Sequence, residues 1–491
     1  MSGIAAVVLV MLATLLIGAF GLRMARTTSD FYVASRTVSP LWNASAIGGE
    51  YLSAASFLGI AGLILTFGAD MLWLPVGWTG GYLVLLVLVS APLRRSGAYT
   101  LPDFAEARLE SMAVRRLSSV LVVVIGWLYL MPQFQSAGLV FRTITGAPAW
   151  AGSLLVAGVV ATNVLSGGMR SITFVQAFQY WLKLTALAVP LAFMLIVWWG
   201  DGSPALPPGD DWILPLHGPE HPVYETYSLI LATFLGTMGL PHVLVRFYTN
   251  PDGRAARRTT LVVLTLLGAF YLMPAVYGFL GRVYGLPASD TVVIGLPGRL
   301  VGGPVGDLLT ALATAGAFAA FLSTSSGLTV SVAGVIAQDI LGGGVRSFRV
   351  ATVVAVVIPF ALAGAARSLP VATVVGLAFA VAASSFCPLL VLGIWWRRLT
   401  TVGAACGLLA GGGLACFAVV TTIAGGPRSG WAEALLAQPA AWTVPVSFTV
   451  MIVVSLLTPS RVPRGVARTM VRLHTPETLD VDRGDWHPRF M

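Results

Sequence analysis

Four consecutive hydroxyl residues in an otherwise apolar stretch are the first feature of this sequence that could do chemistry. Ser323, Thr324, Ser325 and Ser326 lie within the apolar run 302–340. Hydroxyl oxygens, together with backbone carbonyls freed from helix hydrogen bonds, suit a small hard cation because such a cation prefers oxygen ligands. Hydroxyls in a helix also commonly bond back to their own backbone, so the run alone leaves both interpretations open.

Two ionisable residues also lie deep in apolar stretches. Glu50 lies within 41–67, and Lys183, the only lysine of the chain, lies near the middle of 171–199. Lys183 is about twelve residues from the inner end of its stretch, roughly 18 Å along a helix, which is too far for its side chain to reach the interface easily. Ionisable groups at membrane depth are costly and point to function. A structural Glu50–Lys183 pair, binding of a substrate carboxylate by Lys183, and replacement of a cation by Lys183 all remain open.

No enzyme signature accompanies these residues. The sequence contains no HExxH, no GxSxG and no phosphate-binding loop, and its five histidines lack metal-ligand spacing. We therefore expect a protein that is not an enzyme and that needs no cofactor.

The composition places these residues in a membrane protein. Of 491 residues, 57% are hydrophobic and only 10% are charged, and the mean hydropathy is +0.85. A soluble domain carries roughly 25% charged residues, so this chain could not cover a water-facing surface. Disordered and nucleic-acid-binding classes are excluded on the same grounds. The near-absence of lysine beside 28 arginines indicates a GC-rich, bacterial genome. We expect a multi-pass protein of the inner or plasma membrane, surrounded by lipid.

Thirteen stretches are apolar and long enough to cross a bilayer, which takes about 20 residues. They are 2–22, 41–67, 71–93, 117–141, 149–166, 171–199, 225–247, 259–282, 302–340, 350–366, 370–396, 402–424 and 440–458. The long run 302–340 predicts a tilted helix with a cytoplasmic extension. Cytoplasmic loops carry an excess of basic residues. Placing the N-terminus outside puts 23 of the 28 arginines inside and leaves five outside, which predicts an N-out, C-in topology.

Two of these stretches are interrupted in a matched way. Gly48 and Gly49 interrupt the second stretch, and a Gly-Leu-Pro sequence at 239–241 interrupts the seventh. Each begins a set of five stretches, and an offset of five gives the two sets opposite orientations, which is typical of inverted-repeat transporters. We predict one symporter domain over 1–460, with repeats at 41–199 and 225–396, and a cytoplasmic tail over 461–491.

Three motifs resemble the sodium:solute symporter family, and the resemblance covers the chain up to about residue 460. Asp30-Phe-Tyr-Val-Ala-Ser-Arg36 is similar to the segment before the family's first core helix, and 239–247 is similar to its sixth core helix. The family's C-terminal signature matches at Gly393, Ile394, Arg398, Gly403, Ala404, Gly407 and Gly411. The stretch 49–60 most resembles the acetate and monocarboxylate symporters.

The resemblance implies an all-α, LeuT-like fold of five plus five helices, with one extra helix before and two after this core. It also implies a sodium site formed by the carbonyls of Gly49, Leu52 and Ala320 and the hydroxyls of Ser323 and Thr324. Gln176 stands where some members have an aspartate that binds another sodium, so a second sodium is not expected. Ser56 and Leu240 stand where sugar transporters place polar sugar contacts, which favours a small, partly apolar substrate. The candidate substrate contacts are Glu50, Tyr51, Ser53, Ser56, Lys183, Leu240 and His242.

These observations predict a secondary active transporter that couples sodium entry to the uptake of acetate, propionate or pyruvate. A proton could replace sodium as the coupling ion. A same-family symporter for proline, pantothenate or another organic anion is the first alternative. A transporter-like sensor is the second, although such sensors precede a signalling module and few residues follow the last predicted span.

Overall fold

The computed structural model describes residues 2–22, 39–206, 211–216, 220–287, 289–365, 369–427 and 429–479, and the regular elements within these ranges are all helical. They are α1 (Ser2–Leu22), α3 (Pro40–Tyr51), η2 (Ala55–Gly59), α4 (Ile60–Phe67), η3 (Gly68–Leu72), α5 (Trp73–Val84), η4 (Leu85–Val89), α6 (Ser90–Arg95), α7 (Leu101–Leu109), α8 (Met112–Thr145), α9 (Ala149–Gly200), η5 (Asp211–Ile213), α10 (Pro222–Gly239), α11 (Pro241–Tyr248), α12 (Gly253–Val283), α13 (Val292–Val301), α14 (Gly303–Val335), η6 (Ile336–Ile340), α15 (Val345–Leu362), α16 (Val371–Trp395), α17 (Thr401–Gly407), η7 (Leu408–Gly412), α18 (Gly413–Ile423), α19 (Gly430–Ala437), α20 (Ala440–Leu457), η8 (Pro459–Arg461) and α21 (Val466–His474).

Twelve helices within the described residues are long and apolar enough to cross a membrane, which confirms the all-α polytopic class. One of them, Ala55–Arg95, is 41 residues long, about 61 Å at helical rise, or roughly twice the thickness of the hydrocarbon core. It contains the glycine Gly68, whose φ of +77° is a left-handed conformation that favours glycine. Two crossings that meet at Gly68 would restore the predicted thirteen, and this count stays a prediction.

The long helix expected at the ninth stretch is present. Gly303–Ile340 forms one apolar element of 38 residues, made of α14 and η6. At about 1.5 Å per residue it is roughly 57 Å long, well beyond the hydrocarbon thickness of about 30 Å. The element therefore has length to extend past the bilayer at one end, as the sequence predicted.

Both predicted helix breaks are present, but the first lies at Leu52 and Ser53, after Gly48 and Gly49, which belong to α3. α3 ends at Tyr51 and the chain resumes a helical path at Ala55, while α10 ends at Gly239 and α11 begins at Pro241. Pro241 has no N–H group, so it opens α11 without leaving a donor unpaired. At the first break, the N–H of Ala54 donates to the Gln133 Oε1 atom over 3.0 Å. Side-chain and proline chemistry thus stabilise two interruptions in the middle of apolar helices.

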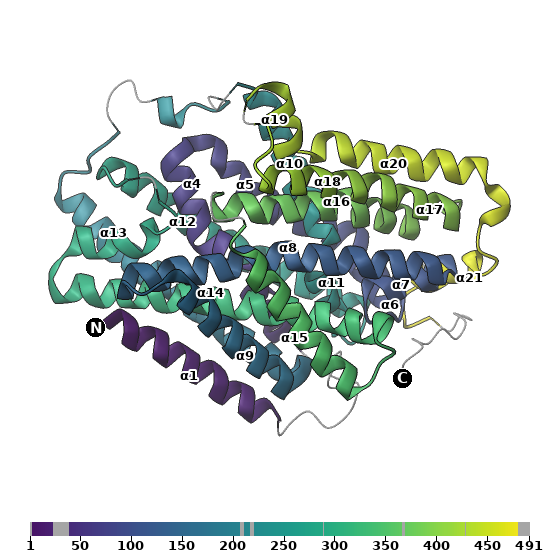
Figure 1. Cartoon of the computed structure of the whole chain (residues 1–491), viewed down its shortest axis with the longest axis horizontal. Coiled ribbons are helices and arrows are strands. Elements are labelled where there is room, and N and C mark those ends of the chain that lie inside the picture. The colour runs from purple at the N-terminus through teal and green to yellow at the C-terminus, as the bar shows by residue number, and fades with distance from the viewer. Residues whose placement is uncertain are drawn as a thin grey trace.

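The two broken helices lie within a bundle that runs lengthwise through the molecule (Figure 1). α14 crosses its centre and packs on α9, α8, α3 and α1, while α10 packs on α16 and α5. α1 lies at one edge of the bundle and α20 at the opposite edge (Figure 1). The first break is therefore enclosed by α9 and α14.

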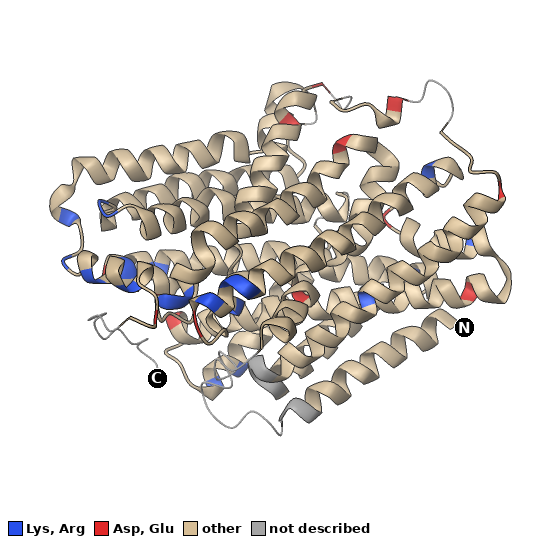
Figure 2. Cartoon of the chain, turned by 180° about the vertical axis from the view of Figure 1, so that it is seen from behind, with Lys and Arg blue, Asp and Glu red and all other residues tan. Residues whose placement is uncertain are grey.

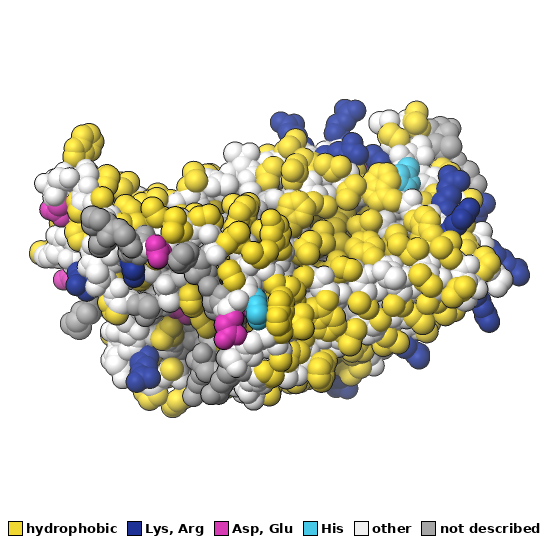
Figure 3. Space-filling view, turned by 90° about the horizontal axis from the view of Figure 1, so that it is seen from above, with side chains coloured by type: hydrophobic (Ala, Val, Ile, Leu, Met, Phe, Trp, Pro, Cys, Tyr) yellow, Lys and Arg dark blue, Asp and Glu magenta, His cyan; other side chains and the backbone are white. Residues whose placement is uncertain are grey.

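Charged side chains are unevenly distributed along the bundle. Figure 2 shows most Lys and Arg residues at the end of the bundle where α7 and α21 lie. The space-filling view in Figure 3 shows a broad hydrophobic band between that end and the end where acidic side chains lie. This distribution agrees with the predicted N-out, C-in orientation, which stays a prediction.

Candidate functional site

The buried lysine lies at the first helix break. Lys183 on α9 is completely buried, and its Nζ atom donates to the Gly49 carbonyl, to the Leu52 carbonyl over 2.7 Å and to the Ser323 Oγ atom over 2.8 Å. An ammonium group has three N–H donors, and each of them has a partner here. All three partners belong to the predicted set of sodium ligands.

The remaining two predicted sodium ligands lie at the same junction. The Ser323 hydroxyl donates to the Ala320 carbonyl over 3.1 Å, and the Thr324 hydroxyl donates to the Glu50 carbonyl over 2.6 Å. The structure therefore brings all five predicted residues to the place where α3 ends against α14. The Ser323 hydroxyl bonds within its own helix, as one interpretation of the hydroxyl run expected, and it also accepts from Lys183. Binding of a small cation by this run stays a prediction.

Glu50 is paired with an arginine and not with Lys183. The Arg246 Nε atom lies 2.7 Å from Glu50 Oε2, and both side chains are almost fully buried. Arg246 also donates to Thr173 Oγ1 over 2.7 Å and to the Gln176 amide oxygen. The Gln176 Nε2 atom in turn donates to the Ser323 carbonyl over 2.8 Å. A polar network thus joins α3, α9, α11 and α14 directly beside the lysine.

The 23 arginines predicted to lie inside include Arg246, so the sequence analysis missed this residue as a partner of Glu50. The residue actually lies in the last turn of α11 and is buried. One sequence feature could have indicated that Arg246 is buried at the site. It lies only four residues after His242, in the half of the broken helix that follows the second break.

A cluster of buried aromatic side chains lies beside the two breaks. The ring centroids of Phe379 and Trp78 are 5.5 Å apart, those of Phe379 and Tyr129 are 5.9 Å apart, and those of Tyr129 and His242 are 5.2 Å apart. Tyr51 joins this group through Phe379, at 6.2 Å between centroids, and Tyr82 packs on Tyr51 at 4.9 Å. These rings come from α3, α5, α8, α11 and α16, so five elements contribute to one cluster.

Several buried polar atoms in this region form no hydrogen bond of normal geometry. They are the Ser53 hydroxyl, the Trp78 Nε1 atom, the Tyr82 hydroxyl and both ring nitrogens of His242. Ser53 lies close to the Tyr129 hydroxyl. A buried polar atom without a partner costs free energy, so such a group of atoms calls for a ligand or water. Ser53 and His242 were predicted from the sequence; Trp78, Tyr82 and Tyr129 were not.

The other predicted substrate contacts have partners within the protein. The Ser56 hydroxyl is 3.0 Å from the Tyr271 hydroxyl, and the Tyr51 hydroxyl is 2.8 Å from Thr237 Oγ1. Leu240 is fully buried at the second break, where its backbone is extended. These residues border the same region without leaving unsatisfied atoms there.

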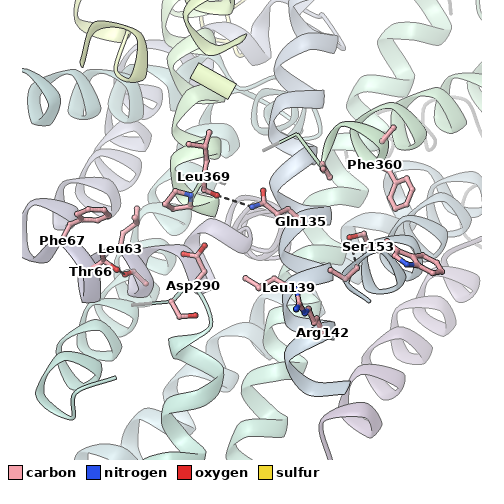
Figure 4. Close-up of a pocket in the computed structure, with 18 residues that line it drawn as sticks. Leu63, Thr66, Phe67, Gln135, Leu139, Arg142, Ser153, Asp290, Phe360 and Leu369 are labelled. Atoms are coloured by element: carbon pink, nitrogen blue, oxygen red, sulfur yellow. Dashed lines mark hydrogen bonds between the residues drawn. The ribbon is translucent and has the colours of Figure 1, made fainter. Parts of the chain in front are cut away.

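A separate cavity of about 660 Å³ lies beside α4, the helical half that follows the first break (Figure 4). Its lining includes Leu63, Thr66, Gln135, Arg142 and Asp290. Gln135 donates to the Leu369 carbonyl over 3.3 Å across this cavity. Burial raises the pKa of Asp290, and the hydrogen bond from the Val371 N–H group opposes that rise.

An ion cluster holds the opposite end of the bundle together. Arg115 on α8 contacts Asp103 over 2.8 Å, Glu106 over 2.5 Å and Asp339 over 2.7 Å. Because these three acids belong to α7 and η6, the cluster ties α8 to both elements. Burial raises the pKa of Asp103, and the adjacent Arg115 guanidinium opposes that rise.

Comparison with known proteins identifies the family. The model of the sodium:solute symporter family matches residues 31–411. An uncharacterised symporter of Bacillus subtilis strain 168, YwcA, is 34% identical over 423 residues, which cover 81% of this chain and 82% of that protein. The chain belongs to the sodium:solute symporter family. The symporter is therefore a sodium-coupled secondary transporter and not an enzyme. Of the motifs that indicated the family, 30–36 lies outside the described residues.

Solved structures confirm the predicted LeuT-like fold of the symporter. A substrate-bound, outward-open Na⁺-coupled sialic acid symporter matches with a TM-score of 0.71 at 14% identity, over 93% of this chain and 98% of that one. Mhp1, a nucleobase-cation-symport-1 family transporter, matches with a TM-score of 0.60 at 13% identity, over 91% of this chain and 100% of that one. MhsT in complex with L-phenylalanine matches with a TM-score of 0.52 at 14% identity, over 84% of this chain and 98% of that one.

Proposed function

We propose that the symporter takes up a small monocarboxylate, such as acetate, propionate or pyruvate, together with sodium and by alternating access. The observation that carries this proposal is the aromatic region between the two helix breaks, where the Ser53 hydroxyl, beside Tyr129, and both ring nitrogens of His242 are buried without a hydrogen bond of normal geometry. Aromatic side chains suit contact with a short hydrocarbon chain. The few unpaired polar atoms suit one compact polar group, such as a carboxylate.

The electrostatics at the breaks also favour an anion. α11 begins at Pro241 and the first helix resumes at Ala55, so two helix N-termini lie at the breaks. A helix N-terminus carries a partial positive charge that attracts an anionic group, and broken transporter helices use it for that purpose. The Glu50 carboxylate is bound by Arg246, and each N–H donor of Lys183 has a partner, whereas a hydroxyl with one partner can form a further hydrogen bond. We therefore place the solute against Tyr51, Ser53, Ser56, Leu240 and His242.

Sodium, in this proposal, binds the carbonyls of Gly49, Leu52 and Ala320 and the hydroxyls of Ser323 and Thr324. The support is that these oxygens lie together where α3 ends, and the C-terminal end of a helix carries a partial negative charge. One sodium ion that crosses a potential of 100 mV contributes about 2.3 kcal/mol to uptake. A sodium ion that holds α3 against α14 would order the neighbouring solute region.

The two ends of the bundle differ in the way that alternating access requires. The 660 Å³ cavity opens beside α4, whereas the Arg115 cluster closes the end at α7 and η6. We infer that the cavity faces outside and the cluster faces the cytoplasm, in the cell membrane of a bacterium. The symporter domain would then span 1–460, with repeats at 41–199 and 225–396 and a cytoplasmic tail over 461–491.

Uptake by purified symporter in proteoliposomes tests the proposal. Labelled acetate is offered under an inward sodium gradient, with unlabelled propionate, pyruvate, proline and pantothenate as competitors. We expect sodium-dependent acetate uptake that propionate and pyruvate inhibit and that proline and pantothenate do not. Competition by proline or pantothenate alone would assign a different solute. Uptake of none of these solutes would favour the alternative that the protein is a transporter-like sensor.

A further inference from the structure

The position of the single lysine has a consequence beyond the proposed solute. The Lys183 ammonium contacts three of the five oxygens proposed for sodium, namely those of Gly49, Leu52 and Ser323. A sodium ion would have to contact these same oxygens. One group of oxygens cannot bind both cations in the same way at the same time.

The surroundings explain why a positive charge is stable at this point. The Gly49 and Leu52 carbonyls lie at the C-terminal end of α3, where the helix ends and carbonyls have no helical N–H group to accept from. The partial negative charge of that helix end favours a cation. The nearest carboxylate, that of Glu50, is already bound by Arg246 over 2.7 Å. Lys183 is therefore held by the same features that would hold sodium.

We propose that the Lys183 ammonium and a sodium ion are mutually exclusive occupants of this site, so that Lys183 is a tethered competitor of sodium. This inference rests on the proposed sodium site. While sodium is bound, the ammonium must leave the three oxygens. Once sodium has departed, the ammonium satisfies oxygens that would otherwise be buried without a donor, which is costly. The lysine thus stabilises the sodium-free carrier and lowers the apparent affinity for sodium.

The size of the effect follows from the fraction of molecules in which the ammonium occupies the site. If sodium can bind only to the remaining fraction, its apparent dissociation constant rises by the inverse of that fraction. Occupation in nine-tenths of the molecules gives about a tenfold rise. Removing the ammonium should remove this rise.

The test measures sodium binding through thermal stability of the purified full chain, without any solute. Wild type, Lys183→Met and Gln179→Met are titrated with sodium chloride against choline chloride at constant ionic strength. Gln179→Met is the matched control, because Gln179 is also fully buried on α9 but donates to Thr14 on α1 over 3.0 Å. We expect Lys183→Met to reach half of its sodium-dependent rise in melting temperature at about tenfold lower sodium than wild type, and Gln179→Met to match wild type.

Equal sodium midpoints for wild type and Lys183→Met would overturn the inference, as would a Lys183→Met protein that sodium does not stabilise. Lys183→Gln, which keeps amide donors but no charge, is the second variant in case Lys183→Met does not fold, and the same shift is expected. Sodium-gradient uptake separates this inference from the proposed function. Sodium-independent uptake by wild type, together with sodium stabilisation of Lys183→Met, would support the inference and contradict sodium coupling of the wild type.

Discussion

Gly327 on α14 makes room for the Glu50 carboxylate. A Cβ atom at Gly327 would lie 2.1 Å from Glu50 Oε1, far inside van der Waals contact. Glu50 in turn is held by Arg246, which also bonds Thr173 and Gln176. The absence of one methyl group on α14 therefore permits the ion pair that joins α3 to α11.

Gly327→Ala should displace Glu50 and weaken its bond to Arg246. We expect a loss of about 1–3 kcal/mol of stability, the usual cost of overpacking, measured as a lower melting temperature and a lower yield of folded symporter. Gly334→Ala is the control, because Gly334 is on the same helix and a Cβ there meets no atom within 4 Å. Equal stabilities of the two variants would show that Glu50 has room to move.

Removal of one member of the buried ion pair should be more damaging. Arg246→Met leaves the Glu50 carboxylate buried without its partner, which typically costs about 3–5 kcal/mol. The double variant Arg246→Met with Glu50→Gln should recover part of this loss, since no unpaired charge remains. Melting temperatures of the single and double variants measure the coupling, and Arg254→Met, at an exposed position, is the control. A double variant no more stable than Arg246→Met alone would argue against the pair.

The sequence predicted the elements of this site better than their contacts. Apolar length, the glycines at 48–49 and the Gly-Leu-Pro sequence at 239–241 were sufficient to identify the broken helices, because these signals are local. They placed the first break a few residues too early, since α3 continues through both glycines to Tyr51. The five sodium ligands came from a family resemblance. The partners of Lys183 and Glu50 were not predictable, because Arg246 is 196 residues from Glu50 along the chain and only packing decides which cation faces it.

The aromatic cluster was missed for a related reason. Trp78, Tyr129 and Phe379 lie in three separate apolar stretches, where an aromatic residue is ordinary and carries no signal of its own. Their convergence depends on how α5, α8 and α16 pack together. Long-range packing, and not local pattern, therefore defines the proposed solute region.

Ser53→Ala should separate solute binding from stability. The Ser53 hydroxyl is buried and forms no hydrogen bond of normal geometry, so its removal should leave the melting temperature unchanged or slightly higher. If the hydroxyl binds the solute carboxylate, the KM for uptake should rise about tenfold, equivalent to about 1.4 kcal/mol. Ser136→Ala is the control, since the Ser136 hydroxyl donates within its own helix to the Pro132 carbonyl. An unchanged KM for Ser53→Ala would place the solute elsewhere.

The topology gives a prediction that needs no purified protein. A reporter that is active only in the cytoplasm should be active when it is fused after residue 460, because the basic residues of the segment that follows are expected inside. A second fusion in the loop between α9 and α10 should be inactive. Activity in the reverse pattern would contradict the N-out, C-in orientation. Activity of both fusions, or of neither, would contradict the odd number of crossings predicted between them.

Ser323 and Thr324 should respond differently to sodium, although both are proposed ligands. The Ser323 hydroxyl accepts from Lys183. Ser323→Ala therefore removes an oxygen that both the sodium ion and the competing Lys183 ammonium would contact. Thr324 bonds the Glu50 carbonyl and not Lys183. Thr324→Ala should therefore weaken the binding of sodium without affecting the Lys183 ammonium. We expect Thr324→Ala to raise the sodium concentration for half-maximal uptake by about tenfold, or about 1.4 kcal/mol, and Ser323→Ala to raise it less.

Uptake into proteoliposomes, measured as a function of sodium concentration, checks that Thr324→Ala needs more sodium than Ser323→Ala. Ser331→Ala, at another buried position on α14, is the control and should match wild type. In the Lys183→Met background the competitor is gone, so Ser323→Ala should then raise the sodium requirement as much as Thr324→Ala does. The sodium concentrations for half-maximal uptake of Ser323→Ala and Thr324→Ala can be compared as a ratio. If this ratio is the same with and without Lys183, the lysine does not share the Ser323 oxygen with sodium.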